Sequence, residues 1–221
     1  MTAPIYNGLI RTYAGAWILP NAKEEHIELF VQDAWNLIEQ MKEKDIPINV
    51  FILNNMLLLH KNALFTQEVH EKVLPLYEKY RIDPNLYTYQ NLIQLYEDMG
   101  ENGLVIETYE RMIQLGIEPN HLIMRNYLLA SIKVKHMDRI VDWLKWYKER
   151  DIFPPDPQIR VLSKIKNPPD SLFIALKALP KRFGQYREEY RSFTPPSKRT
   201  RSFKQMGKKT GANKRTKKKG L

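Results

Sequence analysis

The sequence predicts an all-α protein organised as an α-solenoid of about four helix-turn-helix repeats. Similar proline-containing turns recur at intervals of about 35 residues, over residues 45–49, 83–85, 118–120 and 153–155. Between successive turns, apolar residues follow the spacing of two helices joined by a short break. Hairpins with a period in the mid-thirties bury their apolar faces only against neighbouring hairpins, which is typical of a solenoid.

The repeat over residues 86–120 shows how the helices are predicted. Its first helix has an apolar stripe at Tyr89, Leu92, Ile93 and Tyr96. Asn102 and Gly103 then turn the chain. The second helix has its stripe at Val105, Ile106, Tyr109, Met112 and Ile113. Gly116 can adopt the left-handed conformation that ends a helix, and Pro119 keeps the helix from resuming.

The repeats before it follow the same plan. The first is expected at residues 3–49, with an outer helix over about residues 24–44 and an insertion around residues 17–26 relative to the repeat period. The second is expected at residues 50–85. Pro75 lies inside its outer helix, where proline kinks a helix or shifts its boundary.

The fourth repeat, at residues 121–155, has large aromatic residues that we expect to pack in the core: Trp143, Trp146 and Tyr147. This completes the predicted solenoid over residues 1–155. Residues 156–192 are expected to form a degenerate helical cap, with helices over residues 159–165, 171–179 and 181–192. An atypical last unit covers the final apolar face of a solenoid.

Charge separates the chain into an acidic array and a basic end. Residues 191–221 contain twelve Lys or Arg and no Asp or Glu, whereas residues 1–190 contain 23 basic and 25 acidic residues. The tail at residues 193–221 is poor in apolar residues, so by itself it is expected to be intrinsically disordered. The array, most acidic over residues 97–118, is expected to contact basic proteins.

Composition and motifs argue against an enzyme. The chain has no Cys, which excludes disulfides and Cys-ligated metals. Its five His form no metal-binding spacing, and no Gly-rich phosphate loop is present. We therefore expect no cofactor, no metal, no catalytic residue and no small-molecule substrate. No apolar run is long enough for a membrane span, and no leader is recognised before the first repeat.

The repeats open and close with recurring runs of residues. Residues 5–10 read Ile-Tyr-Asn-Gly-Leu-Ile and residues 88–93 read Thr-Tyr-Gln-Asn-Leu-Ile. Residues 41–46 read Met-Lys-Glu-Lys-Asp-Ile and residues 112–120 read Met-Ile-Gln-Leu-Gly-Ile-Glu-Pro-Asn. With these runs the chain resembles the pentatricopeptide-repeat (PPR) family, which implies a right-handed solenoid. The tetratricopeptide repeat has a similar period but a Trp-x-x-Leu-Gly run that is absent here, and it is the structural alternative.

The resemblance implies an RNA-binding groove along the inner helices, in which two side chains of each repeat read one base. The matching pairs are Asn7 with Asn49, Asn54 with Asn85, Gln90 with Asn120, and Arg125 with Pro155. The apolar residues that flank a base in the family match Pro4, Phe51, Tyr87 and Leu122. A Lys that often binds phosphate is matched only by Lys133. The alternative, favoured by the acidic array, is that the polar residues cap helices and face water.

The basic tail is the second candidate site. Its cations can neutralise phosphates and release counterions, which gives RNA binding with little sequence preference. The residues are Lys198, Arg199, Arg201, Lys204, Lys208, Lys209, Lys214, Arg215, Lys217, Lys218 and Lys219. Phe193 and Phe203 could stack on bases. The alternatives are a solvated tail and a nuclear-localisation patch.

Together these features predict a non-catalytic RNA-binding scaffold. The resemblance places it in a mitochondrial ribosome or its assembly intermediates, with the tail on rRNA and the array against other ribonucleoprotein subunits; a plastid is the alternative compartment. Two other functions remain open. One is a free organellar RNA-processing, stability or translation factor that binds single-stranded RNA in the groove. The other is a protein-protein adaptor of the tetratricopeptide type.

Overall fold

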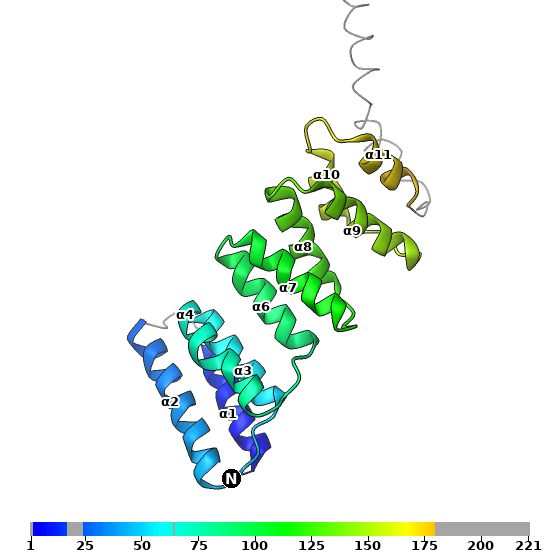
Figure 1. Cartoon of the computed structure of the whole chain (residues 1–221). Helices are drawn as coiled ribbons and strands as arrows, with labels where there is room; N and C mark the ends of the chain where they lie inside the picture. Colours follow the sequence, from blue (N-terminus) through cyan, green and yellow to red (C-terminus); the bar gives the residue numbers. More distant parts are fainter. Residues whose placement is uncertain (1, 17–23, 64, 180–221) are drawn as a thin grey trace, which may run out of the picture. The chain divides into compact units, whose positions relative to one another are not determined.

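The computed structural model describes residues 2–16, 24–63 and 65–179, and all regular secondary structure in these ranges is helical (Figure 1). The predicted all-α class is therefore correct. The chain divides into two compact units, one ending at Lys135 and the other beginning at His136. The first contains α1 (Ala3–Ala16), α2 (Glu24–Glu43), α3 (Val50–Asn62), α4 (Thr66–Glu68), η1 (Val69–Val73), α5 (Leu74–Lys79), α6 (Leu86–Asp98), α7 (Asn102–Gln114) and α8 (His121–Lys133). The second contains α9 (Met137–Glu149), α10 (Asp156–Ser163) and α11 (Asp170–Lys177).

In the first unit, the inner helices form a continuous layer. α1 packs against α3, α3 against α6, and α6 against α8. The outer helices α2 and α7 pack against α1 and α6, and the η1–α5 segment packs against α3. Side chains such as Ile10, Leu53, Ile93 and Leu128 are fully buried between them. Each hairpin thus buries its apolar stripe against its neighbours, as expected for a helical repeat.

The recurring turns have one common geometry. The residues that end the outer helices, Asp45, Arg81 and Gly116, have φ of 50°, 53° and 72°. The next residue, an Ile in all three turns, donates its N–H to a carbonyl five residues earlier, as in Ile82 N to Tyr77 O at 2.8 Å. This is the Schellman arrangement that closes a helix. The Asn three residues after this Ile then caps the following inner helix.

Pro75 changes the helix that contains it. The outer helix of the second repeat is divided into α4, a π-helical turn over Val69–Val73 and α5. The N–H of Leu74 bonds to the carbonyl of Val69, five residues back. Because proline has no N–H and its ring crowds the preceding turn, the wider π turn accommodates it. The expected effect of Pro75 on this helix is confirmed.

One predicted stripe is partly wrong. Val105, Ile106 and Met112 of α7 are buried, but Ile113 is 42% exposed. Ile113 follows Met112 directly, and a step of one residue rotates a side chain by about 100° around a helix. Met112 therefore faces the core while Ile113 points away from it.

The second unit is built around α9. Its Trp143 and Tyr147 are fully buried, with ring centroids 4.6 Å apart, and Trp146 is half-buried. α11 packs against α9. α10 begins three residues before the predicted start at residue 159, because Asp156 and Pro157 suit the first turn of a helix. The predicted helix over residues 181–192 lies outside the described residues. No described helix is long and apolar enough to cross a membrane.

Candidate functional site

The structure brings together two of the four predicted base-reading pairs, and both consist of amide side chains. The Asn54 Nδ2 atom donates to Asn85 Oδ1 at 3.1 Å, and Asn120 Nδ2 donates to Gln90 Oε1 at 2.7 Å. Each bond joins one inner helix to the residue that caps the next inner helix. The two pairs differ, however, in how many of their polar atoms are already bonded.

The Asn54 pair is part of a closed network. The Oδ1 atom of Asn54 accepts hydrogen bonds from Tyr77 Oη at 2.8 Å and Thr88 Oγ1 at 2.6 Å. Burial raises the pKa of Tyr77 to about 12, so its hydroxyl stays protonated and can donate. Asn85 Oδ1 accepts from the N–H groups of Tyr87 and Thr88, which form the first turn of α6. Asn54 is only 7% exposed, so little of it can reach a ligand.

The Gln90 pair is more open. Asn120 caps α8 by accepting from the N–H of Ile123 at 3.0 Å, and this fixes its amide nitrogen toward Gln90. Both side chains are half-exposed. The Nε2 group of Gln90 makes no hydrogen bond to any described residue. This pair therefore presents two N–H donors to a ligand.

The predicted pair of Asn7 and Asn49 is not joined by a hydrogen bond. Asn49 instead caps α3, accepting from the N–H groups of Phe51 and Ile52, both at 3.1 Å. Asn7 Oδ1 accepts from Asn55 Nδ2 at 2.7 Å. For Asn49, capping is thus the observed role, since an Asn at this position satisfies otherwise unpaired N–H groups.

The sequence reasoning missed a second row of asparagines. Asn55, Asn91 and Asn126 each directly follow the predicted base-reading residue of their helix. Asn91 Nδ2 donates to the carbonyl of Asn54 at 3.4 Å, and Asn126 Nδ2 donates to Gln94 Oε1 at 3.3 Å. These bonds join consecutive inner helices. The recurrence of Asn at one position of three repeats was the signal that could have identified them.

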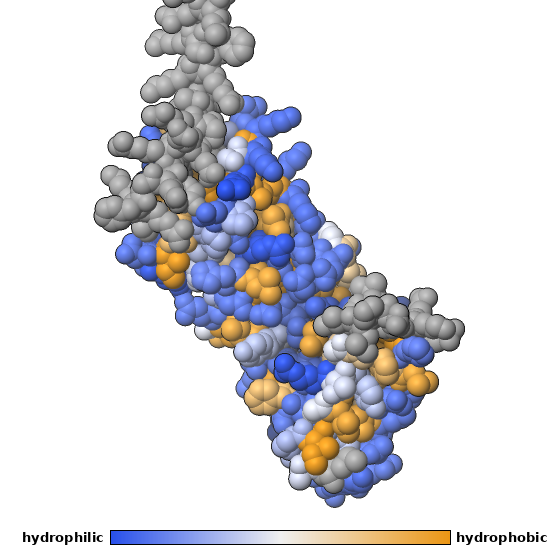
Figure 2. Space-filling view, turned by 180° about the vertical axis from the view of Figure 1, so that it is seen from behind, coloured by the Kyte–Doolittle hydropathy of each residue, from blue (hydrophilic) through white to orange (hydrophobic). Residues whose placement is uncertain are grey.

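Large apolar side chains stand exposed at the start of three inner helices. Phe51 of α3 is 61% exposed, Tyr87 of α6 is 62% exposed and Leu122 of α8 is 37% exposed. Pro4 of α1 is also exposed. They occupy the same position of their repeats, which the sequence predicted to flank a base. On the face seen in Figure 2, apolar side chains lie among hydrophilic ones, so the distinguishing property of these three is their repetition.

The phosphate position is weakly basic. Lys133 and Arg125 are exposed on α8, and Arg125 lies 3.4 Å from Asn126 Oδ1. At the equivalent position of α3, Asn62 donates to the carbonyl of Ala14 at 2.9 Å. In α6 this position is Asp98, which accepts from Gln94. Pro155, the predicted partner of Arg125, belongs to the second unit, so this pair remains a prediction.

The remaining predicted site residues, those of the tail from Lys198 to Lys219, lie outside the described residues. Among the described residues, no three His, Asp or Glu side chains are grouped as a metal site would require. Neutral His60 is buried: its Nε2 accepts from Trp35 Nε1 at 3.2 Å, and its Nδ1 lies 2.8 Å from the carbonyl of Met56. Burial lowers its pKa, which keeps it uncharged. It serves packing between α2 and α3.

Comparison with known proteins finds the same repeat. A family model described as the pentatricopeptide repeat domain matches residues 36–99 and 77–133. A mitochondrial pentatricopeptide repeat-containing protein of Arabidopsis thaliana is 31% identical over 109 residues, which make up 48% of this chain and 18% of that protein. The chain therefore matches less than a fifth of the length of this relative.

Two solved structures of Arabidopsis thaliana proteins share the fold. The PPR domain of protein-only RNase P 1, in complex with tRNA, has a TM-score of 0.61 and 14% identity, covering 74% of this chain and 80% of that chain. Nuclear proteinaceous RNase P 2 has a TM-score of 0.58 and 11% identity, covering 86% of this chain and 41% of that chain. Together with the recurring turns and the repeated inner-helix positions, these matches make residues 36–133 similar to the pentatricopeptide repeat domain, and they support membership of this family.

Proposed function

We propose that this protein is a non-catalytic RNA-binding repeat protein that holds single-stranded RNA against its inner helices. The observation that carries the proposal is the exposure of Phe51, Tyr87 and Leu122 at one repeated position. A single exposed apolar side chain is common on protein surfaces. Here the same position carries one in three repeats, which suits a ligand that is itself made of repeating units. Stacking on an aromatic side chain contributes about 1–3 kcal/mol per base.

The amides beside these side chains supply hydrogen bonds to bases. Asn120 accepts the N–H of Ile123 and donates to Gln90 Oε1, which leaves the two N–H groups of Gln90 Nε2 as donors for a base. They favour base edges with acceptors. Asn54 is saturated by Tyr77 and Thr88, so the second repeat is expected to stack on a base without reading it. That a structural neighbour is a PPR domain bound to tRNA supports RNA as the ligand class.

Binding of short single-stranded RNA oligonucleotides to the whole protein tests this function. The double variant Phe51→Ala, Tyr87→Ala should weaken binding by about tenfold or more, given the stacking energies. Leu29→Ala is the matched control, because Leu29 of α2 is 61% exposed but lies outside the repeated position. Unchanged binding by the double variant would refute the groove, and no RNA binding by the intact protein would favour the protein-protein adaptor.

A second candidate function rests on the charge distribution. The twelve cations and absent carboxylates of residues 191–221 suit an anchor on rRNA. In this form the protein is a scaffold of an organellar ribosome or its assembly intermediates. The mitochondrial relative supports a mitochondrial location, with a plastid as the alternative. Sedimentation of the native protein tests the scaffold: migration with ribosomal particles supports it, and a small free species contradicts it.

A further inference from the structure

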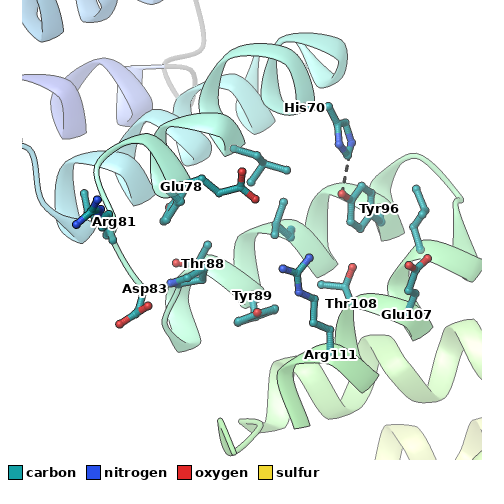
Figure 3. A pocket seen from close by; sticks show the side chains of 16 residues that line it. His70, Glu78, Arg81, Asp83, Thr88, Tyr89, Tyr96, Glu107, Thr108 and Arg111 are labelled. Atoms are coloured by element: carbon teal, nitrogen blue, oxygen red, sulfur yellow. Dashed lines mark hydrogen bonds between the residues drawn. The ribbon is translucent and has the colours of Figure 1, made fainter. Parts of the chain in front are cut away.

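The first unit contains a cleft that the proposed RNA contacts do not use. It has a volume of about 500 Å³ and lies between α5 and α7, over α6 (Figure 3). Its apolar lining includes Leu74, Tyr77, Leu92 and Leu104. None of the exposed residues Phe51, Tyr87 and Leu122 lines it. The cleft is thus a separate candidate for binding.

The π-helical turn before Pro75 contributes to this cleft. A π turn adds one residue to a helical turn, so it shifts every later side chain relative to the turns before it. Leu74, Tyr77 and Glu78 of α5, which follow the π turn, all line the cleft. At one end, His70 of the π turn lies 3.3 Å from the hydroxyl of Tyr96. π turns occur often at functional sites, which independently supports a functional role for this segment.

Charged groups at the rim have no ionic partner within the described chain. Glu78 of α5 and Arg111 of α7 both extend toward the cleft in Figure 3, yet neither forms an ion pair with a described residue. Glu107 of α7 and Asp83 also lie at the rim without such a pair. These side chains are exposed, so water screens them until a ligand excludes it.

The charge around the cleft favours a cationic ligand. The lining has a small acidic excess, with Glu78, Asp83 and Glu107 against Arg81 and Arg111. The wider stretch over residues 97–118, which includes the α7 wall, adds to it with six acidic residues and one basic residue. A polyanion would be repelled by such a surface, whereas Lys and Arg side chains would be attracted. An apolar floor with a charged rim is also the usual anatomy of a protein-protein contact. Arg111 and Thr108 can donate hydrogen bonds to the carbonyls of a docked main chain.

We propose that this cleft binds a basic segment of a partner protein. A large apolar side chain of the segment fills the space over Leu92 and Leu104. Lys or Arg residues on either side of it pair with Glu78 and Glu107. Arg111 holds the main chain of the segment. Protein binding at this cleft is separate from RNA binding at the inner helices, so the two can fail independently.

Fluorescence anisotropy with labelled synthetic peptides tests the proposal on the whole protein. The probe has a central Leu-Phe pair flanked by lysines; one control peptide has Glu for Lys, and another has Ala for Leu and Phe. We expect the basic apolar peptide to bind at least about tenfold more tightly than either control. Equal binding of all three peptides, or preference for the acidic one, would overturn the proposal.

Charge reversal locates the contact. Glu78→Lys with Glu107→Lys should weaken binding of the basic peptide by about tenfold or more, while RNA binding is not weakened. The matched control is Glu28→Lys with Glu43→Lys, which makes the same charge change at exposed positions of α2. If both double variants lose the same affinity for the basic peptide, the effect comes from overall charge, and the cleft is not the binding site.

The absence of Cys in the sequence permits a site-specific check. Leu104→Cys places a unique thiol at the cleft, and Ile113→Cys places one on α7 where the side chain is exposed but does not line it. A basic peptide whose terminal cysteine is activated as a mixed disulfide with 5-thio-2-nitrobenzoate should react with the first variant faster than with the second, since the protein thiolate displaces thionitrobenzoate and forms the disulfide with the peptide. Equal reaction rates of the two variants would contradict the assignment. So would RNA that, by itself, slows the reaction of the thiol in Leu104→Cys.

Discussion

Replacing Asn54 with alanine should destabilise the first unit by about 2–3 kcal/mol. Asn54 Oδ1 accepts a hydrogen bond from the Tyr77 hydroxyl, at 2.8 Å, and Tyr77 is only 4% exposed. A buried donor left without an acceptor costs about 1–3 kcal/mol. Thr88 loses less, because its hydroxyl can turn to Asn85 Oδ1, 3.4 Å away. The unpaired Tyr77 hydroxyl therefore dominates the loss, with the bond to Asn85 adding to it.

Urea unfolding followed by circular dichroism measures this effect. Tyr77→Phe alone should cost about 1 kcal/mol, because Thr88 still donates to Asn54. The double variant should cost less than the sum of the two single variants by about 1 kcal/mol, since it leaves no unpaired Tyr77 hydroxyl. Asn36→Ala, at an exposed position of α2, is the control and should be nearly neutral. Strictly additive losses would refute the closed network.

Three other perturbations follow from the structure. Gln90→Ala should change base preference more than Asn54→Ala does, measured with RNA oligonucleotides that differ at one base; equal effects would contradict the open Gln90 pair. Because burial lowers the pKa of His60, stability should be greatest above the usual pKa near 6.5 and fall below it, by up to about 1.4 kcal/mol per pH unit; the decrease should be absent in His60→Phe. Pro75→Ala restores an N–H, so hydrogen exchange in α5 should slow and the basic peptide should bind less tightly.

The turns were the most predictable part of the fold. Gly116 and Pro119 end one outer helix by backbone chemistry that needs no tertiary contact. The resemblance to the PPR family paired Asn85 with Asn54 and Asn120 with Gln90, and a hydrogen bond joins each of these two pairs. The sequence could not show how many polar atoms of each pair are already hydrogen-bonded to other residues. Tyr77 reaches Asn54 from an outer helix 23 residues away, and whether its hydroxyl arrives depends on packing.

The cleft was not predictable for a related reason. Pro75 indicated a disturbed helix, and the structure contains one. The space between α5 and α7 depends on how far apart the two helices pack, and hydrophobic periodicity carries no information about that distance. The exposed Ile113 illustrates the same limit, because one helical step separates it from the fully buried Met112.

Because of the charge distribution, the RNA contacts proposed for the inner helices and for the tail should differ in their salt dependence. Residues 1–159 contain 16 basic and 22 acidic residues, so this part of the chain attracts phosphates only weakly. RNA binding there must come from stacking on the bases and from hydrogen bonds to the side-chain amides. Stacking on Phe51 and Tyr87 releases few counterions, whereas each cation of the tail that meets a phosphate adds to the salt slope. Removing residues 191–221 should therefore flatten the salt dependence of RNA affinity but leave base preference in place. Loss of base preference in that truncated chain would move recognition from the inner helices to the tail.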